Sequence, residues 1–371
     1  MWMWILLILA ILPMPWVAQL VWPHRVKFAE IATIAAISAA LTLVVYGVGR
    51  YAAMADIEML NGQVLNKERE HDRYEQSYSC RCKQVCTKTN GHQSCYEKCD
   101  TCYETHYTVK WYVETSLHPI TIDSRDSTSR RVYNEPDPAR YTEIKKGDPV
   151  TISHRYINYV KAAPDSLFHA SSSAIGTFGS KIPAYPSGIY DIYKLDRVLS
   201  VGVPIPDLRE WNAAVSKYLS VVGITKQANL IILFVNEDNS NYIHALAGSW
   251  VGGKKNDIVV VVGSTEYPTI SWVRILAWTD NEEFKVRMVH ELEELKTIDL
   301  PRFMDVVKRN VDTYYKRKPM ADYEYLEYSF DPPWWVVVLA LLVGILSAGG
   351  ITYWFYVEDT RITNSMRRFR K

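Results

Sequence analysis

The sequence lacks an excess of charge of either sign. Its 371 residues include 42 Lys and Arg and 41 Asp and Glu, which gives a formal net charge of +1. A protein that binds nucleic acid through bulk electrostatics carries a large basic excess, so we expect no nucleic-acid partner. The chain also lacks any Asn-x-Ser/Thr sequence. Because that sequence is the acceptor of N-linked glycans, its absence disfavours a glycosylated eukaryotic ectodomain.

Charged residues are also missing from three long apolar stretches. Residues 1–22, 31–49 and 334–357 contain no Asp, Glu, Lys or Arg. Each stretch, as a helix, is long enough to cross a hydrocarbon core about 30 Å thick. The alternative is a cleaved signal peptide followed by two buried core helices, but the first stretch lacks the basic residues that begin a signal peptide. The sequence therefore predicts three transmembrane helices.

Basic residues beside these stretches predict the orientation of the chain in a membrane. Short cytoplasmic loops and tails are enriched in Lys and Arg. Such residues lie between the first two stretches and after the third: His24, Arg25 and Lys27, then Arg361, Arg367, Arg368, Arg370 and Lys371. Arg50 alone lies on the opposite side. We therefore expect the N-terminus and residues 56–333 outside the cytoplasm and the C-terminus inside it.

All six cysteines fall in the segment that is predicted to be outside. They have the spacing C-x-C-x3-C-x8-C-x3-C-x2-C, and six cysteines allow fifteen pairings. A separation of four residues puts two cysteines on one helix face, and residues 89–92 have turn chemistry. The spacing therefore favours a helical hairpin with nested disulfides, which would join Cys86 to Cys95, Cys82 to Cys99 and Cys80 to Cys102.

A metal site is the alternative explanation for the cysteines, with His92 and His106 as further ligands. Structural zinc sites commonly use two C-x2-C pairs, and here only Cys99 and Cys102 have that spacing. An oxidising compartment favours disulfides. Between Cys80 and Cys102 the one aliphatic side chain is Val85, so covalent or metal cross-links must hold this segment together.

The C-terminal half predicts an α/β (α+β) domain. Residues 230–235 and 258–262 are unbroken apolar runs, typical of parallel strands covered on both faces, and residues 242–250 between them have helical spacing. Residues 271–277 alternate like a third strand, and residues 282–296 and 300–315 predict two helices. We expect five regions: two transmembrane helices in 1–55, a Cys-rich and strand-containing module in 56–170, a loop linker in 171–206, the α/β domain in 207–331, and a transmembrane helix with a basic tail in 332–371.

The order of strand, polar turn, helix, Gly-Lys-Asn loop and Val-rich strand resembles the TPM domain. The residues that carry this resemblance are Tyr242, Ala245, Leu246, Trp250, Gly252, Lys254, Asn256, Asp257 and residues 258–262. TPM domains lie on the far side of membranes, in the thylakoid lumen, the bacterial envelope and receptor-modulating proteins. The resemblance implies a TPM-like three-layer core. It also implies a possible metal role, since some TPM relatives are associated with calcium binding or weak phosphatase activity.

Four carboxylates are the candidate metal ligands. Glu237 and Asp238 follow a predicted central strand, where open α/β sheets place ligand sites, and Asp257 and Asp280 are expected at the same rim. Clustered carboxylates suit a hard cation such as calcium. The alternative is capping, in which Asp238 and Asn239 begin one helix and Asp280 and Asn281 begin the next. Two other motifs are incomplete: residues 248–255 lack the Ser or Thr of a phosphate-binding loop, and His290-Glu291 lacks the second His of H-E-x-x-H.

Several phrases resemble uncharacterised membrane proteins of large tailed bacteriophages and some bacteria, namely SYSCRCKQVC, DPARYTEIKKGDPV and YVKAAPDSLF. The resemblance implies a bacterial cell envelope, hence an inner-membrane protein whose large domain is periplasmic. We expect a membrane-anchored protein that binds or assembles other envelope proteins, because no catalytic constellation is complete. The alternative is a calcium- or magnesium-dependent phosphatase-like hydrolase at the carboxylate rim.

Overall fold

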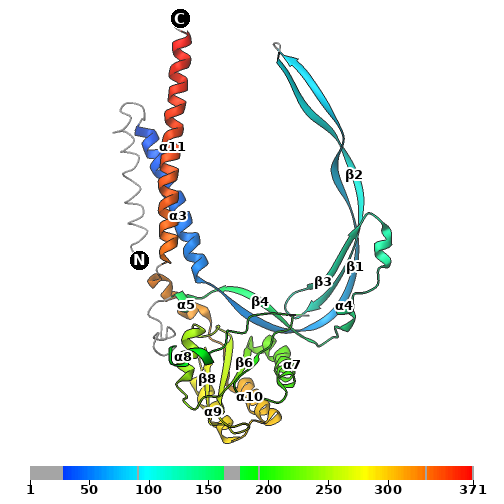
Figure 1. The fold of residues 1–371 in the computed structure, drawn as a ribbon, viewed down its shortest axis with the longest axis vertical. Helices are drawn as coiled ribbons and strands as arrows, with labels where there is room; N and C mark the ends of the chain where they lie inside the picture. Colours follow the sequence, from blue (N-terminus) through cyan, green and yellow to red (C-terminus); the bar gives the residue numbers. More distant parts are fainter. Residues whose placement is uncertain (1–27, 90–91, 163–175, 191–192, 331, 370–371) are drawn as a thin grey trace.

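Two long apolar helices leave the rest of the molecule from one end (Figure 1). This computed structural model describes residues 28–89, 92–162, 176–190, 193–330 and 332–369. Helices α3 (Phe28–Met54) and α11 (Trp334–Phe369) contain apolar segments of 26 and 25 residues, Ala29–Met54 and Trp334–Glu358, long enough to cross a membrane. Only 28% of each apolar window is buried, whereas a core helix of a soluble domain is mostly buried. The first predicted span, residues 1–22, lies outside the described residues.

Helices α3 and α11 pack side by side and antiparallel (Figure 1). Ile31 near the start of α3 packs with Ala348, whereas Tyr46 near its end packs with Ala340. At Gly49 the helices are so close that an added Cβ would lie 2.4 Å from Cγ1 of Val336. The antiparallel packing puts the start of α3 and the C-terminal half of α11 at one end of the pair, and the intervening chain leaves from the other end.

The first sheet is antiparallel and has the strand order β3-β2-β1-β4. Its strands are β1 (Ala55–Thr89), β2 (His92–Thr115), β3 (Ile120–Ser127) and β4 (Pro149–Ile157). Strand β4 pairs with β1 only from Ala55 to Gln63, and β3 pairs with β2 only from Tyr107 to Val113. Beyond the pair Arg73 and Tyr107, β1 and β2 therefore continue as a ribbon of two strands, here called the ribbon.

The prediction of a helical hairpin at the cysteines was wrong. Strands β1 and β2 pair from Val64 and Thr115 to Thr89 and His92, with irregularities at Val64/Asn66 and Cys80/Lys83. A separation of four residues puts side chains on one face of a strand as well as on one face of a helix, so the C-x3-C spacing could not distinguish the two.

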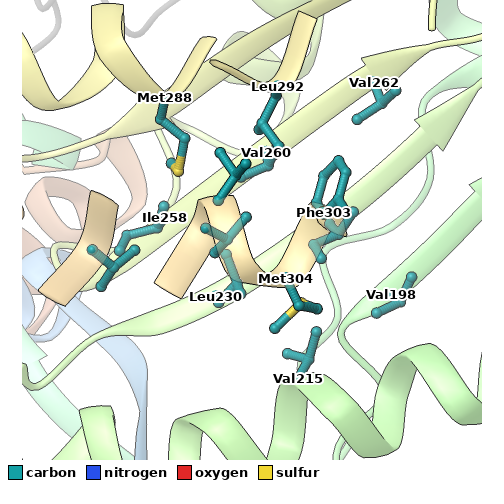
Figure 2. Packing of buried hydrophobic residues seen from close by; sticks show 14 of the residues in the cluster. Val198, Val215, Leu230, Ile258, Val260, Val262, Met288, Leu292, Phe303 and Met304 are labelled. Carbon is teal, nitrogen blue, oxygen red and sulfur yellow. The ribbon is translucent and has the colours of Figure 1, made fainter. Parts of the chain in front are cut away.

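The second sheet forms a three-layer α/β unit. Its order is β5-β6-β7-β8, with β8 alone antiparallel; the strands are β5 (Val198–Val201), β6 (Asn229–Val235), β7 (Asp257–Gly263) and β8 (Trp272–Ala277). One face is covered by α7 (Leu208–Lys226), α9 (Glu282–Glu294) and α10 (Leu300–Tyr314), as Figure 2 shows. The other is covered by α8 (Tyr242–Ser249) and residues near Phe178. The predicted parallel pair, the third strand and the three helices after residue 240 are confirmed.

Both faces of β6 and β7 are buried, as their unbroken apolar runs predict. Leu230, Ile232 and Phe234 face α7 and α10, whereas Ile231 and Leu233 face α8. Strand β5 lies within the range that was expected to be a linker. Short elements complete the described chain: η1 (Arg130–Asn134), α4 (Ala139–Glu143), α5 (Tyr159–Ala162), η2 (Gly179–Lys181) and η3 (Met320–Ser329).

Helix α7 touches the first sheet at Gly223. A Cβ at this position would lie 2.4 Å from the backbone oxygen of Asn61 and 2.6 Å from its Cβ, both too short for any real contact. Alanine in a helix is favoured over glycine by up to about 1 kcal/mol. Overpacking against backbone costs about 1–3 kcal/mol, so we expect Gly223→Ala to lower the free energy of unfolding.

Chemical unfolding of the full chain in detergent micelles measures this effect. The control is Gly179→Ala, since nothing lies within 4 Å of a Cβ at that position. If Gly223→Ala were as stable as the unaltered protein, α7 would not be packed directly against β1.

Candidate functional site

The register of the second sheet separates the four predicted carboxylates. Asn229 pairs with Asp257 and Val235 pairs with Gly263, so Asp257 begins β7 at the edge opposite to the end of β6. Glu237 and Asp238 follow the end of β6. Because β8 is antiparallel to β7, Asp280 follows its end at the Asp257 edge. The expectation that all four share one rim was therefore wrong, because Asp257 precedes its strand whereas Glu237 follows one.

The first acidic residue after β6, Glu237, stabilises a turn and makes an ion pair. Glu237 lies 2.8 Å from the Lys181 ammonium, and this hydrogen bond lowers the pKa of Glu237. It also accepts hydrogen bonds from the backbone N–H groups of Asp238 and Asn239, both at 3.2 Å. Asp238 is exposed, and the N-cap of α8 is Asn241. Neither Asp238 nor Asn239 is the N-cap of α8, so the capping alternative is wrong at this helix, whereas Asn281 caps α9 as that alternative predicts.

The other edge also gives no convergent metal site. Asp280 lies 3.9 Å from the ammonium groups of both Lys316 and Lys318, and Asn281, not Asp280, caps α9. Among the described residues, one group has metal-ligand spacing: Cys82, Glu97 and Cys99. Since Cys82 and Cys99 are bonded to each other, they offer no thiolate to a metal.

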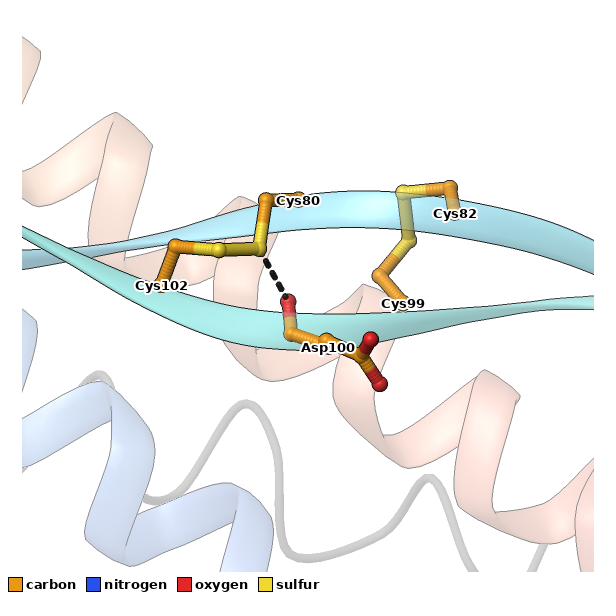
Figure 3. Close-up of a disulfide and its surroundings, with 5 residues drawn as sticks. All are labelled: Cys80, Cys82, Cys99, Asp100 and Cys102. Atoms are coloured by element: carbon orange, nitrogen blue, oxygen red, sulfur yellow. Dashed lines mark hydrogen bonds between the residues drawn. A yellow bond between two sulfur atoms is a disulfide. The ribbon is translucent and has the colours of Figure 1, made fainter.

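Three nested disulfides staple the ribbon. They join Cys80 to Cys102, Cys82 to Cys99 and Cys86 to Cys95, which confirms the predicted pairing; Figure 3 shows the first two. All three lie where neither β3 nor β4 provides a third strand. An isolated two-stranded hairpin is marginally stable at best in water, so the cross-links lie in the part of the sheet that most needs them.

The ribbon exposes large aromatic side chains. Tyr74, Tyr78, Tyr96 and Tyr103 are between 42% and 69% exposed. At its base, His106 stacks on Tyr74 and lies 2.5 Å from Asp126, whose pKa is lowered by the hydrogen bonds from His106 and Tyr74. The base is thus fixed to β3, while the tyrosines beyond it face water.

A buried polar network joins the two sheets, and its centre is Arg197. The side chain is 1% exposed. Its Nε donates to Asn229 at 2.9 Å, Nη1 donates to the Leu195 carbonyl at 3.0 Å, and Nη2 donates to both Asn61 and Thr151. Burial lowers the pKa of Arg197 to about 10, so the group stays charged at neutral pH. Because Asn61 and Thr151 belong to β1 and β4, this guanidinium ties the α/β unit to the first sheet.

Asp257 belongs to the same network. Its carboxylate is 1% exposed and accepts hydrogen bonds from Asn229 at 2.8 Å, from the Tyr185 hydroxyl at 2.9 Å and from the Lys254 N–H at 2.8 Å. Burial raises the pKa of Asp257 to about 6. The Lys254 ammonium in turn lies 2.6 Å from Asp56. The residue that was predicted to bind metal is therefore enclosed by protein donors.

The raised pKa of Asp257 predicts a pH dependence of stability. Because the folded state binds this proton more tightly than the unfolded state, whose pKa is near 3.8, the favourable contribution is complete below about pH 4 and is lost as the pH rises through about 6. Asparagine mimics the protonated form and removes the titration. We expect the difference in unfolding free energy between the unaltered protein and Asp257→Asn to change by about 2–3 kcal/mol across this window.

Denaturant unfolding of both proteins at a series of pH values checks this prediction. All other titrating groups are shared, so their contributions cancel in the difference. A difference that stays constant from about pH 4 to about pH 7 would contradict a raised pKa at Asp257.

Any proposal about function therefore rests on the positions and contacts of the residues described above. Comparisons with models of protein families, with curated proteins and with solved structures found no match to this chain.

Proposed function

We propose that this protein is anchored in a bacterial inner membrane and holds its stapled ribbon on the periplasmic side to bind another envelope protein. The role is binding or assembly. The observation that carries the proposal is the ribbon itself: two strands beside which the described residues place no third strand, three disulfides and exposed tyrosines. Tyrosine is enriched where proteins meet.

The ribbon is not required for the core of the α/β unit. The residues in the two clusters that cover its sheet all come from residues 178–315. Strand β1 rises about 3.3 Å per residue over its 35 residues, so its distal half projects far beyond that core. Covalent fixation of a projecting, unpaired element favours presentation to a partner over internal support.

Three features favour the periplasmic side. Disulfides persist in oxidising compartments. The basic loop and tail favour the cytoplasm, and the antiparallel packing of α3 and α11 places the intervening chain at the opposite end. The TPM-like order of strand, helix and strand is also typical of domains beyond the membrane.

The ribbon must lie in water when α3 and α11 are in a bilayer. In Figure 1 it rises on the same side as these helices, apart from them, and it carries charged residues such as Arg81, Lys83 and Asp100. Charged side chains are too costly to place in hydrocarbon. The β1 irregularity at Val64/Asn66 lies where pairing with β4 ends. Because such bulges bend strands, this is the place where a strand angle different from that in Figure 1 would keep the ribbon in water.

The proposal does not extend to metal-dependent phosphoester hydrolysis. The candidate carboxylates lie at two edges of the sheet. Asp257 is enclosed by donors, and Glu237 is paired with Lys181. A catalytic metal needs several of these oxygens around one point.

Site-specific photo-crosslinking in host membranes tests the proposal. A photoreactive amino acid replaces Tyr78 or Tyr103 in the full chain, and the control position is Val286, which is 70% exposed on α9. We expect both ribbon positions, and not Val286, to trap the same envelope protein. The untagged full chain should compete for this adduct.

A shortened chain is the matched competitor. Gln76 pairs with Glu104, so an Asn-Gly turn can join them in place of residues 77–103 without disturbing the base of the ribbon. This variant should fail to compete. Equal competition by the shortened chain, or the same adduct from Val286, would overturn the proposal.

A further inference from the structure

A cavity of about 460 Å³ lies between helix α7, the start of β4 and the segment before β5. Its size falls in the usual range of small-molecule sites, about 300–1,000 Å³. It lies where the two sheets meet, since Thr151 of β4 and Asn212 of α7 both line it. The cavity is separate from the ribbon, so ligand binding there does not depend on the proposed function.

Among the charged side chains that line the cavity, the basic ones are more numerous. Four cations, Lys194, Arg197, Arg209 and Lys217, face two carboxylates, Asp148 and Asp196. Both carboxylates already accept hydrogen bonds, Asp196 from the Tyr190 hydroxyl and Asp148 from the Lys145 N–H, each at 2.8 Å. Among the described residues that line the cavity, the cations therefore outnumber the carboxylates by two.

The outer cations have no partner of their own. In the part of the chain that the structure describes, the charged groups of Lys194, Arg209 and Lys217 make neither a hydrogen bond nor an ion pair. A single lysine of this kind is usually a solvated surface residue. Three that converge on one concavity with low-dielectric walls concentrate the positive potential there.

The fourth cation is built into the floor of the cavity. Arg197 is almost completely buried, and its Nε, both N–H groups of Nη2 and one N–H of Nη1 donate within the protein. A guanidinium has one more donor on Nη1. A buried charge with an unused donor at a cavity is suited to an anionic acceptor, because the cost of burying the charge falls when it is paired.

We propose that this cavity binds the phosphate group of a phosphate monoester. Such a group carries about −1.5 to −2 charges at pH 7, which balances the excess of two, and its oxygens suit Lys and Arg donors. The monoester is either a soluble metabolite or the headgroup of a lipid such as phosphatidic acid. Bound there, it bridges α7 and the segment before β5.

Binding measurements on the full chain in detergent micelles test the site. The soluble probe is glycerol 3-phosphate, the lipid probe is phosphatidic acid in bicelles, and inorganic sulfate is the competitor. The site variant is Lys194→Gln with Lys217→Gln. The control is Lys98→Gln with Lys110→Gln, which removes the same charge from exposed positions that do not line the cavity. Arg197 is left unchanged because folding depends on it.

We expect saturable binding of one probe, weakened by about tenfold or more in the site variant and unchanged in the control. Binding of glycerol 3-phosphate identifies a soluble ligand, and binding only of phosphatidic acid identifies a headgroup. The proposal is overturned if neither probe binds, if the site variant binds as tightly as the control, or if sulfate competes as well as the phosphate monoester.

Discussion

Replacing Arg197 by Met is expected to lower the free energy of unfolding by about 3–5 kcal/mol. Met has a similar length but no donors, so the buried acceptors on Asn61, Asn229 and Leu195 lose the hydrogen bonds that Arg197 donates to them. Each buried polar group that loses its partner costs about 1–3 kcal/mol. The loss falls where the two sheets meet, so it weakens their attachment as well as the α/β unit.

Denaturant unfolding of the full chain in micelles, followed by tryptophan fluorescence, measures the effect. The matched control is Arg302→Met, since Arg302 is exposed in the first turn of α10 and should change stability by less than about 0.5 kcal/mol. Arg197→Lys keeps the charge but cannot reach all four acceptors, so its effect should be intermediate. Equal stability of Arg197→Met and Arg302→Met would refute a structural role for the network.

Replacing all six cysteines by Ser is expected to open the ribbon without unfolding the α/β unit. The bridges close loops with sequence separations of 9, 17 and 22 residues, and each is worth about 3 kcal/mol in the chain-entropy model. The loops are nested, so the effects are not additive. Loss of even one such contribution raises the population of the open ribbon by about 100-fold. The effect is this large because two unsupported strands have little stability of their own.

Trypsin digestion of the unreduced full chain, followed by mass spectrometry, measures the opening. Cleavage after Arg81, Lys83 and Lys98 should accelerate by about 100-fold in the six-Ser variant. Sites in α7 and α10, such as Lys217 and Lys308, serve as internal controls and should keep their rates. A ribbon that resists trypsin equally without its cysteines would show that another interaction holds it.

The parts of the fold that sequence predicted are those with local signals. The apolar runs that became β6 and β7 are buried on both faces, and Asp299 with Pro301 begins α10 as its residue types indicate. The disulfide pairing also followed from spacing. The secondary structure of that segment did not, because a four-residue separation fits strand and helix alike.

The prediction of a metal site formed by the carboxylates failed for a different reason. Whether two carboxylates meet depends on which end of a strand each occupies, and Asp257 precedes β7 whereas Glu237 follows β6. No sequence pattern indicated the network around Arg197. Its hydrogen-bond partners Asn61 and Asn229 lie 136 and 32 residues away from Arg197 along the chain. Contacts of such separation are fixed by packing of whole elements, which short patterns do not encode.

The side of the membrane on which the disulfides lie decides whether the stapled ribbon is periplasmic. Membrane vesicles that carry the full chain are prepared right-side-out and inverted, treated with a membrane-impermeant phosphine reductant, and then labelled with maleimide. We predict no labelling of the denatured protein without reductant, labelling of all six cysteines in right-side-out vesicles after reduction, and protection in inverted vesicles until the membrane is opened. Free thiols before reduction, or reduction in intact inverted vesicles, would contradict a stapled ribbon on the periplasmic side.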